Sequence, residues 1–140
     1  MTTKEYLSQV RPFDREINRK IDRLGDLYAD AVRVTALFRE APGGGGSERS
    51  FEERMGRYLA LRDEINADID RLADLKQEIR ALIDSLPDET GRSVLEMHYL
   101  RGMTFGEIGD AVGYSPRHIR RIEKKALSFL EPAAVSRAAI

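Results

Sequence analysis

The sequence has no cysteine, no tryptophan and only two histidines, and it has no long run of apolar residues. Without cysteine, disulfides, thiol nucleophiles and thiolate metal sites are excluded. His98 and His118 lie too far apart in sequence to suggest a metal centre, so neither a metal nor another cofactor is expected. A membrane span needs about 20 apolar residues, and the first ten residues carry charges where a secretory signal has its apolar stretch. A cytoplasmic protein without membrane contact is therefore expected.

An excess of charge of one sign is also lacking. The 140 residues contain 23 Lys and Arg against 24 Asp and Glu, a formal charge of −1. This balance excludes a histone-like polycation and a wholly acidic tail protein. Charged residues make up 34% and aromatic residues 7%, which suits long solvated helices better than a compact enzyme. Acidic pairs occur without a pocket signal or a convergent nucleophile beside them, so no enzymatic activity is expected.

Residues 1–86 contain two stretches in which apolar residues recur every seven positions, as in amphipathic helices. The first repeat is Val10, Ile17, Leu24, Ala31 and Phe38, with Phe13, Ile21, Leu27, Tyr28 and Val34 between them. The second is Tyr58, Ile65, Leu72, Ile79 and Leu86, with Leu61, Ile69, Leu75 and Leu82. Residues 41–50, APGGGGSERS, predict the loop between the two helices, because consecutive glycines and a proline disfavour regular structure.

The two stretches predict a long antiparallel helical hairpin, a coiled coil, over residues 1–86. One apolar stripe per helix buries little surface, so a homodimer through the hairpin is expected. Whether the hairpin closes within one chain or is swapped between two stays open. Thr2 with Glu5, and Ser50 with Glu53, have the spacing of capping boxes at the two helix starts. Pro12 either kinks the first helix or marks its true first turn.

After Pro87 the seven-residue repeat stops, and residues 87–131 predict three short helices. Thr104 with Glu107 has the spacing of a capping box at the start of the second helix. Gly113 suits a left-handed turn after it. Ser115 then caps the third helix, whose first turn holds a proline. A helix, a short glycine turn and a capped helix are typical of the helix-turn-helix motif; residues 132–140 are expected to form a flexible tail.

The third helix carries the strongest local charge of the chain. From Ser115 to Lys125 five basic residues stand against Glu123 alone, a local charge of +4 that leaves −5 on the remainder. At 100° per residue, Arg117, Arg121 and Lys124 share the side that faces away from the apolar stripe. The major groove accepts a helix that presents its first residues and a row of cations. The candidate DNA-binding residues are Thr104, Ser115, Pro116, Arg117, His118, Arg120, Arg121, Lys124 and Lys125.

The order of the residues in this region is more specific than a generic helix-turn-helix. It runs Leu86-Pro87, Arg92, Val94-Leu95, Tyr99-Leu100-Arg101-Gly102-Met103-Thr104, Glu107-Ile108-Gly109, Val112-Gly113-Tyr114-Ser115, Ile119-Arg120-Arg121-Ile122 and Lys125-Ala126-Leu127. About 45 of the 140 residues resemble region four of bacterial RNA polymerase sigma factors in this way. The whole chain is also similar to small regulatory proteins encoded by phages and prophages.

The resemblance implies that the last helix binds the minus-35 promoter element and that the domain contacts the flap of RNA polymerase. It places Pro116, Arg117 and Arg121 at base-reading positions, Arg120 at a phosphate-contacting position and Ser115 at the helix N-cap. Pro116 departs from the basic residue usual in the family, which implies one base contact fewer. Nothing before Leu86 resembles the aromatic-rich region that melts promoters, so a complete sigma factor is not expected.

These observations lead to the hypothesis of a sigma-like, phage- or prophage-derived transcription regulator, with double-stranded DNA and RNA polymerase as partners. Two alternatives stay open. One is a DNA-packaging oligomer similar to small terminase subunits, which also join a helix-turn-helix to a coiled coil. The other is a module that binds polymerase or a sigma factor without touching DNA.

Overall fold

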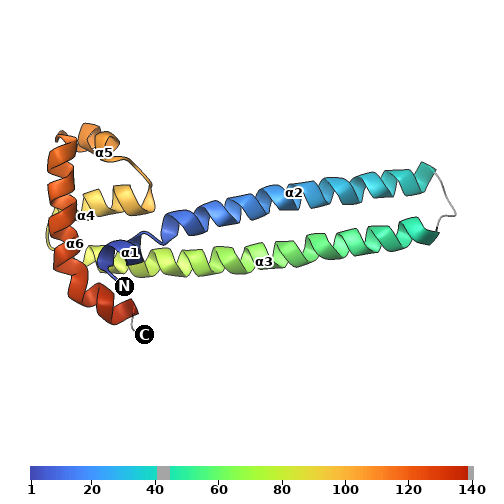
Figure 1. Ribbon diagram of the computed structural model, residues 1–140, viewed down its shortest axis with the longest axis horizontal. Helices are drawn as coiled ribbons and strands as arrows, with labels where there is room; N and C mark the ends of the chain where they lie inside the picture. The colour runs from blue at the N-terminus through green and yellow to red at the C-terminus, as the bar shows by residue number, and fades with distance from the viewer. Residues whose placement is uncertain (41–44, 139–140) are drawn as a thin grey trace. The chain divides into compact units, whose positions relative to one another are not determined.

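The computed structural model describes residues 1–40 and 45–138, and every regular element in these ranges is helical (Figure 1). The elements are α1 (Thr3–Leu7), α2 (Val10–Glu40), α3 (Gly45–Asp84), α4 (Glu89–Leu95), the π-helical turn η1 (Glu96–Leu100), α5 (Phe105–Val112) and α6 (Pro116–Ala138). The predicted all-α fold is confirmed. Within the described ranges, no helix is long and apolar enough to cross a membrane.

The chain divides into two compact units. Unit 1 combines Met1–Phe13 with Leu72–Ile140, and unit 2 is Asp14–Arg71. Helices α2 and α3 each continue from one unit into the other, so unit 2 is a segment of both long helices. The predicted helix-turn-helix region lies within unit 1, where it is joined by the first 13 residues of the chain.

Unit 2 is an antiparallel pair of helices, as the hairpin prediction requires. Its buried apolar residues are Ile17 and Ala31 of α2 and Leu61 and Ile65 of α3. These positions follow the seven-residue repeats, because only residues spaced three and four apart return to the line of contact between two long helices. We call this line of contact the seam. The almost completely buried side chains of the seam are thus small and medium-sized aliphatic ones.

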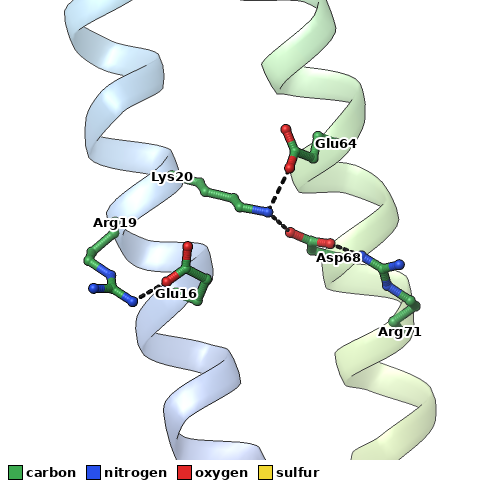
Figure 2. Close-up of polar contacts among 6 residues, drawn as sticks. All are labelled: Glu16, Arg19, Lys20, Glu64, Asp68 and Arg71. Atoms are coloured by element: carbon green, nitrogen blue, oxygen red, sulfur yellow. Dashed lines mark hydrogen bonds and ion pairs between the residues drawn. The ribbon is translucent and has the colours of Figure 1, made fainter.

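A charged contact interrupts the apolar seam of unit 2. The Lys20 ammonium group lies 2.6 Å from an Asp68 carboxylate oxygen and 2.9 Å from Glu64 (Figure 2). Asp68 is only 3% exposed, and Arg71 donates a second hydrogen bond to it from the next turn of α3. Hydrogen bonds from Lys20 and then Arg71 lower the pKa of Asp68, and the bond to Asp68 raises the pKa of Lys20. Both groups therefore stay charged within the seam.

Three residues of the predicted apolar stripes are not buried between the two helices. Ile21, Tyr28 and Ile69 are exposed, by 44%, 54% and 45% respectively. Two helices that pair along one seam bury only two positions of each seven, and these residues each lie one position further round the helix. The Phe38 side chain lies outside the described part of the chain.

The helix starts also differ from the sequence prediction. α3 begins at Gly45, so the predicted loop over 41–50 is too long, and Ser50 lies inside the helix instead of capping it. Extending an existing helix gains one hydrogen bond per residue, which lets a long helix continue into glycines that would not nucleate one. Residues 41–44 of the predicted loop lie outside the described ranges.

The N-terminal stretch forms two helices rather than one. Thr2 caps α1 by accepting a hydrogen bond from the Glu5 N–H, as its spacing predicts. α1 ends at Leu7, and Pro12 lies in the first turn of α2, where its missing N–H has no helical partner to lose. Of the two interpretations of Pro12, the first-turn position is therefore correct.

In unit 1, α4, α5 and α6 enclose a small core of Val94, Ile108 and Ile119, all fully buried. α1 packs against α6, and the Thr3 backbone N–H donates to a Glu131 carboxylate oxygen at 2.9 Å. The Thr3 hydroxyl donates to the same oxygen. These two hydrogen bonds lower the pKa of Glu131. The prediction of a hairpin over residues 1–86 did not include the packing of the first helix, α1, on the last helix, α6.

α6 is also longer than the sequence predicted. It continues through Pro132 to Ala138, whereas a flexible tail was expected from residue 132. Proline removes one backbone donor from a helix, but the turns on either side retain theirs. The predicted tail is therefore helical as far as Ala138, and residues 139–140 lie outside the described ranges.

Candidate nucleic-acid interface

The turn between α5 and α6 is built by three local devices. Thr104 and Glu107 form a reciprocal capping box at the start of α5. Gly113 ends the helix with φ +82°, a left-handed conformation that costs little without a side chain. A Cβ at Gly109 would lie 2.3 Å from the Tyr114 carbonyl oxygen, so only glycine allows α5 to approach the following chain this closely. The predicted capping box and left-handed glycine are both confirmed.

The start of α6 is fixed by its cap. The Ser115 hydroxyl accepts a hydrogen bond from the His118 N–H at 3.2 Å, and Pro116 is the first residue of the helix. Proline suits this position because the first N–H of a helix has no helical partner. The side chain of Tyr114 packs edge-on against the His118 ring, with 4.5 Å between the ring centres. The Ser115 cap and the contact between Tyr114 and His118 together hold the first turn of α6 in place.

Burial divides α6 into two opposite sides. Ile119, Ala126 and Leu130 are almost completely buried. Arg117, Arg121 and Lys124 lie roughly opposite them at 100° per residue, and all three are exposed. We call these three cations and the exposed basic residues beside them, His118, Arg120 and Lys125, the cationic face of α6.

Every predicted DNA-binding residue is exposed. Eight of the nine lie at the cap or in the first three turns of α6, and Thr104 lies apart from them at the start of α5. Exposure leaves these groups available to a ligand, whereas their contact with DNA stays a prediction. The helix-turn-helix geometry places α6 second in the motif, the position of the recognition helix.

One flank of the cationic face is an aromatic stack that sequence reasoning missed. The Arg120 guanidinium lies over the Phe105 ring, 5.4 Å from its centre. Phe105 in turn stacks on His98, with 4.5 Å between ring centres. His98 Nδ1 lies 2.8 Å from the Met103 carbonyl oxygen, so this histidine packs within the domain. The stack restricts Arg120 to the side of α6 that faces α5.

The other flank of the cationic face is a groove of about 410 Å³. Its apolar lining includes Leu86, Ile122 and Phe129, which is 58% exposed. Its charged lining includes Arg121 and Lys125. The cations of α6 are therefore not spread over a flat surface but border a recess beside the start of α4.

The single acidic residue of the first turns of α6 is turned inward. Glu123 is 7% exposed and accepts a hydrogen bond from the Tyr99 hydroxyl at 3.2 Å. Burial and then the nearby Glu123 charge raise the pKa of Tyr99 far above its usual value, so the phenol stays a donor. The other Glu123 oxygen has no hydrogen-bond partner among the described residues. Burial of Glu123 removes negative charge from the cationic face.

Phe105, Tyr99 and Tyr114 support the cationic face but were not among the predicted site residues. Only their aromatic character distinguished them in the sequence, and an aromatic residue at helical spacing is usually a core residue. The π-helical turn η1 was also missed, and it brings Tyr99 to the buried side against α6. Neither the spacing of apolar residues nor the capping residues around 96–100 signals a π-helical turn.

A comparison with protein-family models supports this geometry. Residues 82–130 match the family described as sigma-70, region 4. No curated protein and no solved structure matches the chain. The matched part of the chain is therefore a sigma region 4-like helix-turn-helix domain, a DNA-binding domain class, as its resemblance implied.

Proposed function

We propose that the protein is a transcription regulator that binds promoter DNA by inserting α6 into the major groove. The observation that carries the proposal is the sidedness of α6: its basic residues are exposed, while its one acidic residue in these turns is buried. A cationic helix at the recognition position of a helix-turn-helix domain is suited to phosphates and base edges together.

The finer parts of the proposal come from the family resemblance. The target is a minus-35-type element, and RNA polymerase is a second partner. The regulator acts in the cytoplasm, on genes of a phage or prophage. The family match at residues 82–130 supports this assignment by the domain it identifies.

Two variants test the direct reading of DNA by α6. Arg121→Ala is expected to weaken binding to a selected site by about 1–3 kcal/mol and to relax base preference, because arginine contacts guanine edges bidentately. Lys124→Ala is expected to weaken binding to selected and scrambled DNA alike, since a phosphate contact carries no sequence information. Arg57→Ala, an exposed arginine of unit 2, is the matched control and is expected to change neither.

The measurement is fluorescence anisotropy on duplexes selected from random sequence, with and without polymerase. Equal losses for Arg121→Ala and Lys124→Ala on both kinds of DNA would contradict the assignment of Arg121 as base reader. Absence of DNA binding at low salt, with retention by polymerase, would favour the module that binds polymerase alone. A ring of eight or more subunits in solution would favour the packaging alternative.

A homodimer belongs to the same proposal. A single helix-turn-helix makes few contacts, and joining two of them raises the effective concentration of the second at a neighbouring half-site. Unit 2 is the part of the chain available for that pairing.

A further inference from the structure

Unit 2 exposes six large apolar side chains among its described residues, and five of them lie on one side. The six are Ile21, Tyr28, Val32, Leu37, Leu59 and Ile69. Scattered single apolar residues are normal on protein surfaces, whereas a contiguous set marks an interaction site. All except Leu37 form the set that we call the apolar face.

The contact between Lys20 and Asp68 shows why residues of both helices share this side. These two side chains meet across the seam (Figure 2). The residue after Lys20 and the residue after Asp68 each point 100° further round their own helix. Because the two helices are right-handed and antiparallel, both rotations lead to the same side of the hairpin. Ile21 and Ile69 are therefore neighbours on the apolar face.

The other three members follow from helical spacing. Tyr28 lies seven residues after Ile21, and Val32 four residues after Tyr28, which keeps all three along one side of α2. Leu59 lies ten residues before Ile69, which places it along the same side of α3. The Tyr28 ring also tilts against Tyr58, with 5.7 Å between ring centres, so it leans over the seam rather than away from it.

The opposite side of the hairpin differs sharply in character. On α2 it carries Glu16, Arg19, Arg23, Asp26, Asp30 and Arg33. Several of these are paired, as in the contact of Arg19 with Glu16 (Figure 2) and of Arg33 with Asp30. The charged side is thus a solvated surface. The packing of α2 against α3 in the seam does not require this difference between the two outer sides.

We infer that the apolar face is the docking surface for a second copy of this chain, so that two hairpins of unit 2 pack into a four-helix bundle. The inference assigns the surface for the proposed homodimer, and it stands whether or not α6 contacts DNA. An identical copy is the fitting occupant because the exposed side chains of the face are mainly apolar. Arg62 lies within the face, seven residues before Ile69, but its guanidinium lies 3.5 Å from the neighbouring Asp63 carboxylate, so the face needs no partner of opposite charge.

The size of the face agrees with this occupant. From Leu59 to Ile69 and from Ile21 to Val32 the face extends over about three helical turns, roughly 16 Å. Two helices side by side make it roughly 20 Å wide. This is the scale of the apolar centre of an interface that buries about 800 Å² per partner with a polar rim. Gly25, on the same side of α2, leaves space for close approach, since a Cβ there would meet nothing within 4 Å.

The experiment compares apolar residues on and off the face. Wild-type protein is expected at about twice 15.9 kDa by sedimentation equilibrium. Val32→Glu and Ile69→Glu each place a charge in the interface and are expected to lower dimer affinity by more than about tenfold. Leu37→Glu is the matched control, because Leu37 is 57% exposed on the charged side, and it is expected to leave the mass unchanged. Far-UV circular dichroism checks that each variant stays helical.

A second measurement covers the case in which a glutamate variant fails to fold. The chain has no cysteine, so a nitroxide label reports on one introduced site alone. A label on Val32→Cys is expected to be immobilised in the dimer and mobile after dilution, while one on Leu37→Cys stays mobile throughout. A wild-type mass of one chain at all concentrations overturns the inference, as does a dimer unaffected by both glutamates or equal mobility at the two labels. DNA binding is measured separately, so loss of the dimer and loss of DNA contact are distinguished.

Discussion

At the scale of single residues, two carboxylates that are buried among the described residues are held in different ways. Asp68 sits in the seam of unit 2 with two cations donating to it. Glu123 sits beneath α6 with the Tyr99 hydroxyl as its donor. A buried charge is costly unless it is paired, and an ion pair in an apolar seam favours one register of the helices over others. Asp68 therefore acts on the alignment of the hairpin, while Glu123 acts on the charge of the cationic face.

The lowered pKa of the Asp68 carboxyl group predicts how the stability of the folded chain depends on pH. Its pKa is lowered in the folded chain, as is that of Glu131. Each therefore contributes stability above its unfolded value, near 3.8 and 4.5, that is lost as the pH falls through the lower folded value. The Lys20 pKa is raised, so its contribution is present below 10.5 and is lost above the raised value. The melting temperature is expected to fall on acidification below about pH 4.5 and again at strongly alkaline pH.

Thermal denaturation monitored by circular dichroism checks this prediction. Asp68→Asn is expected to lower the melting temperature at neutral pH and to make it depend less on acid. Asp22→Asn, at an exposed position of the same unit, serves as the control and is expected to behave as wild type. If Asp68→Asn and the wild type lose stability in parallel on acidification, the carboxylate at Asp68 is not the group that responds.

At the scale of elements, the sequence was sufficient to predict those features that depend only on residues close together in the chain. The caps at Thr2, Thr104 and Ser115 and the left-handed Gly113 depend on one or two side chains and their own backbone. The Ser50 prediction was wrong because the same spacing also occurs inside a helix that began earlier. The packing of α1 on α6 depends on residues more than a hundred positions apart, such as Thr3 and Glu131, and no periodicity signals such a contact.

The turn between α5 and α6 yields a prediction at the same scale. Gly109→Ala is expected to destabilise unit 1 by about 1–3 kcal/mol, because the new Cβ overlaps a backbone oxygen that cannot move independently of the turn. Gly106→Ala is the control in the same helix: its nearest neighbour would be 3.8 Å away. Alanine there is expected to stabilise by up to about 1 kcal/mol through helix propensity. Urea denaturation measures both, and similar effects of the two substitutions would contradict the close approach at Gly109.

At the scale of the whole molecule, the net charge is small, but an excess of positive charge lies in one region, the first turns of α6. The chain is close to neutral, at −1, so it has little long-range attraction for a polyanion. The excess of basic over acidic residues lies in the first turns of α6, while several charges of unit 2 pair with one another. The composition alone excluded a polycation but did not locate the cationic face; the location came from the turn that precedes Ser115. DNA binding by such a molecule depends on a short-range contact in one orientation.

That separation predicts how binding responds to salt. Each phosphate neutralised by a basic residue releases counterions, which gives a slope of about −0.9 per contact in a log–log plot of affinity against salt. If about five phosphates are neutralised, the slope is expected near −4 to −5. Lys124→Ala is expected to reduce its magnitude by about 1, whereas Arg57→Ala leaves it unchanged. Anisotropy titrations over a range of salt concentrations measure the slope. A value near zero would mean that the exposed cations of α6 do not face the DNA backbone, and an equal change in both variants would mean that the attraction is spread over the molecule.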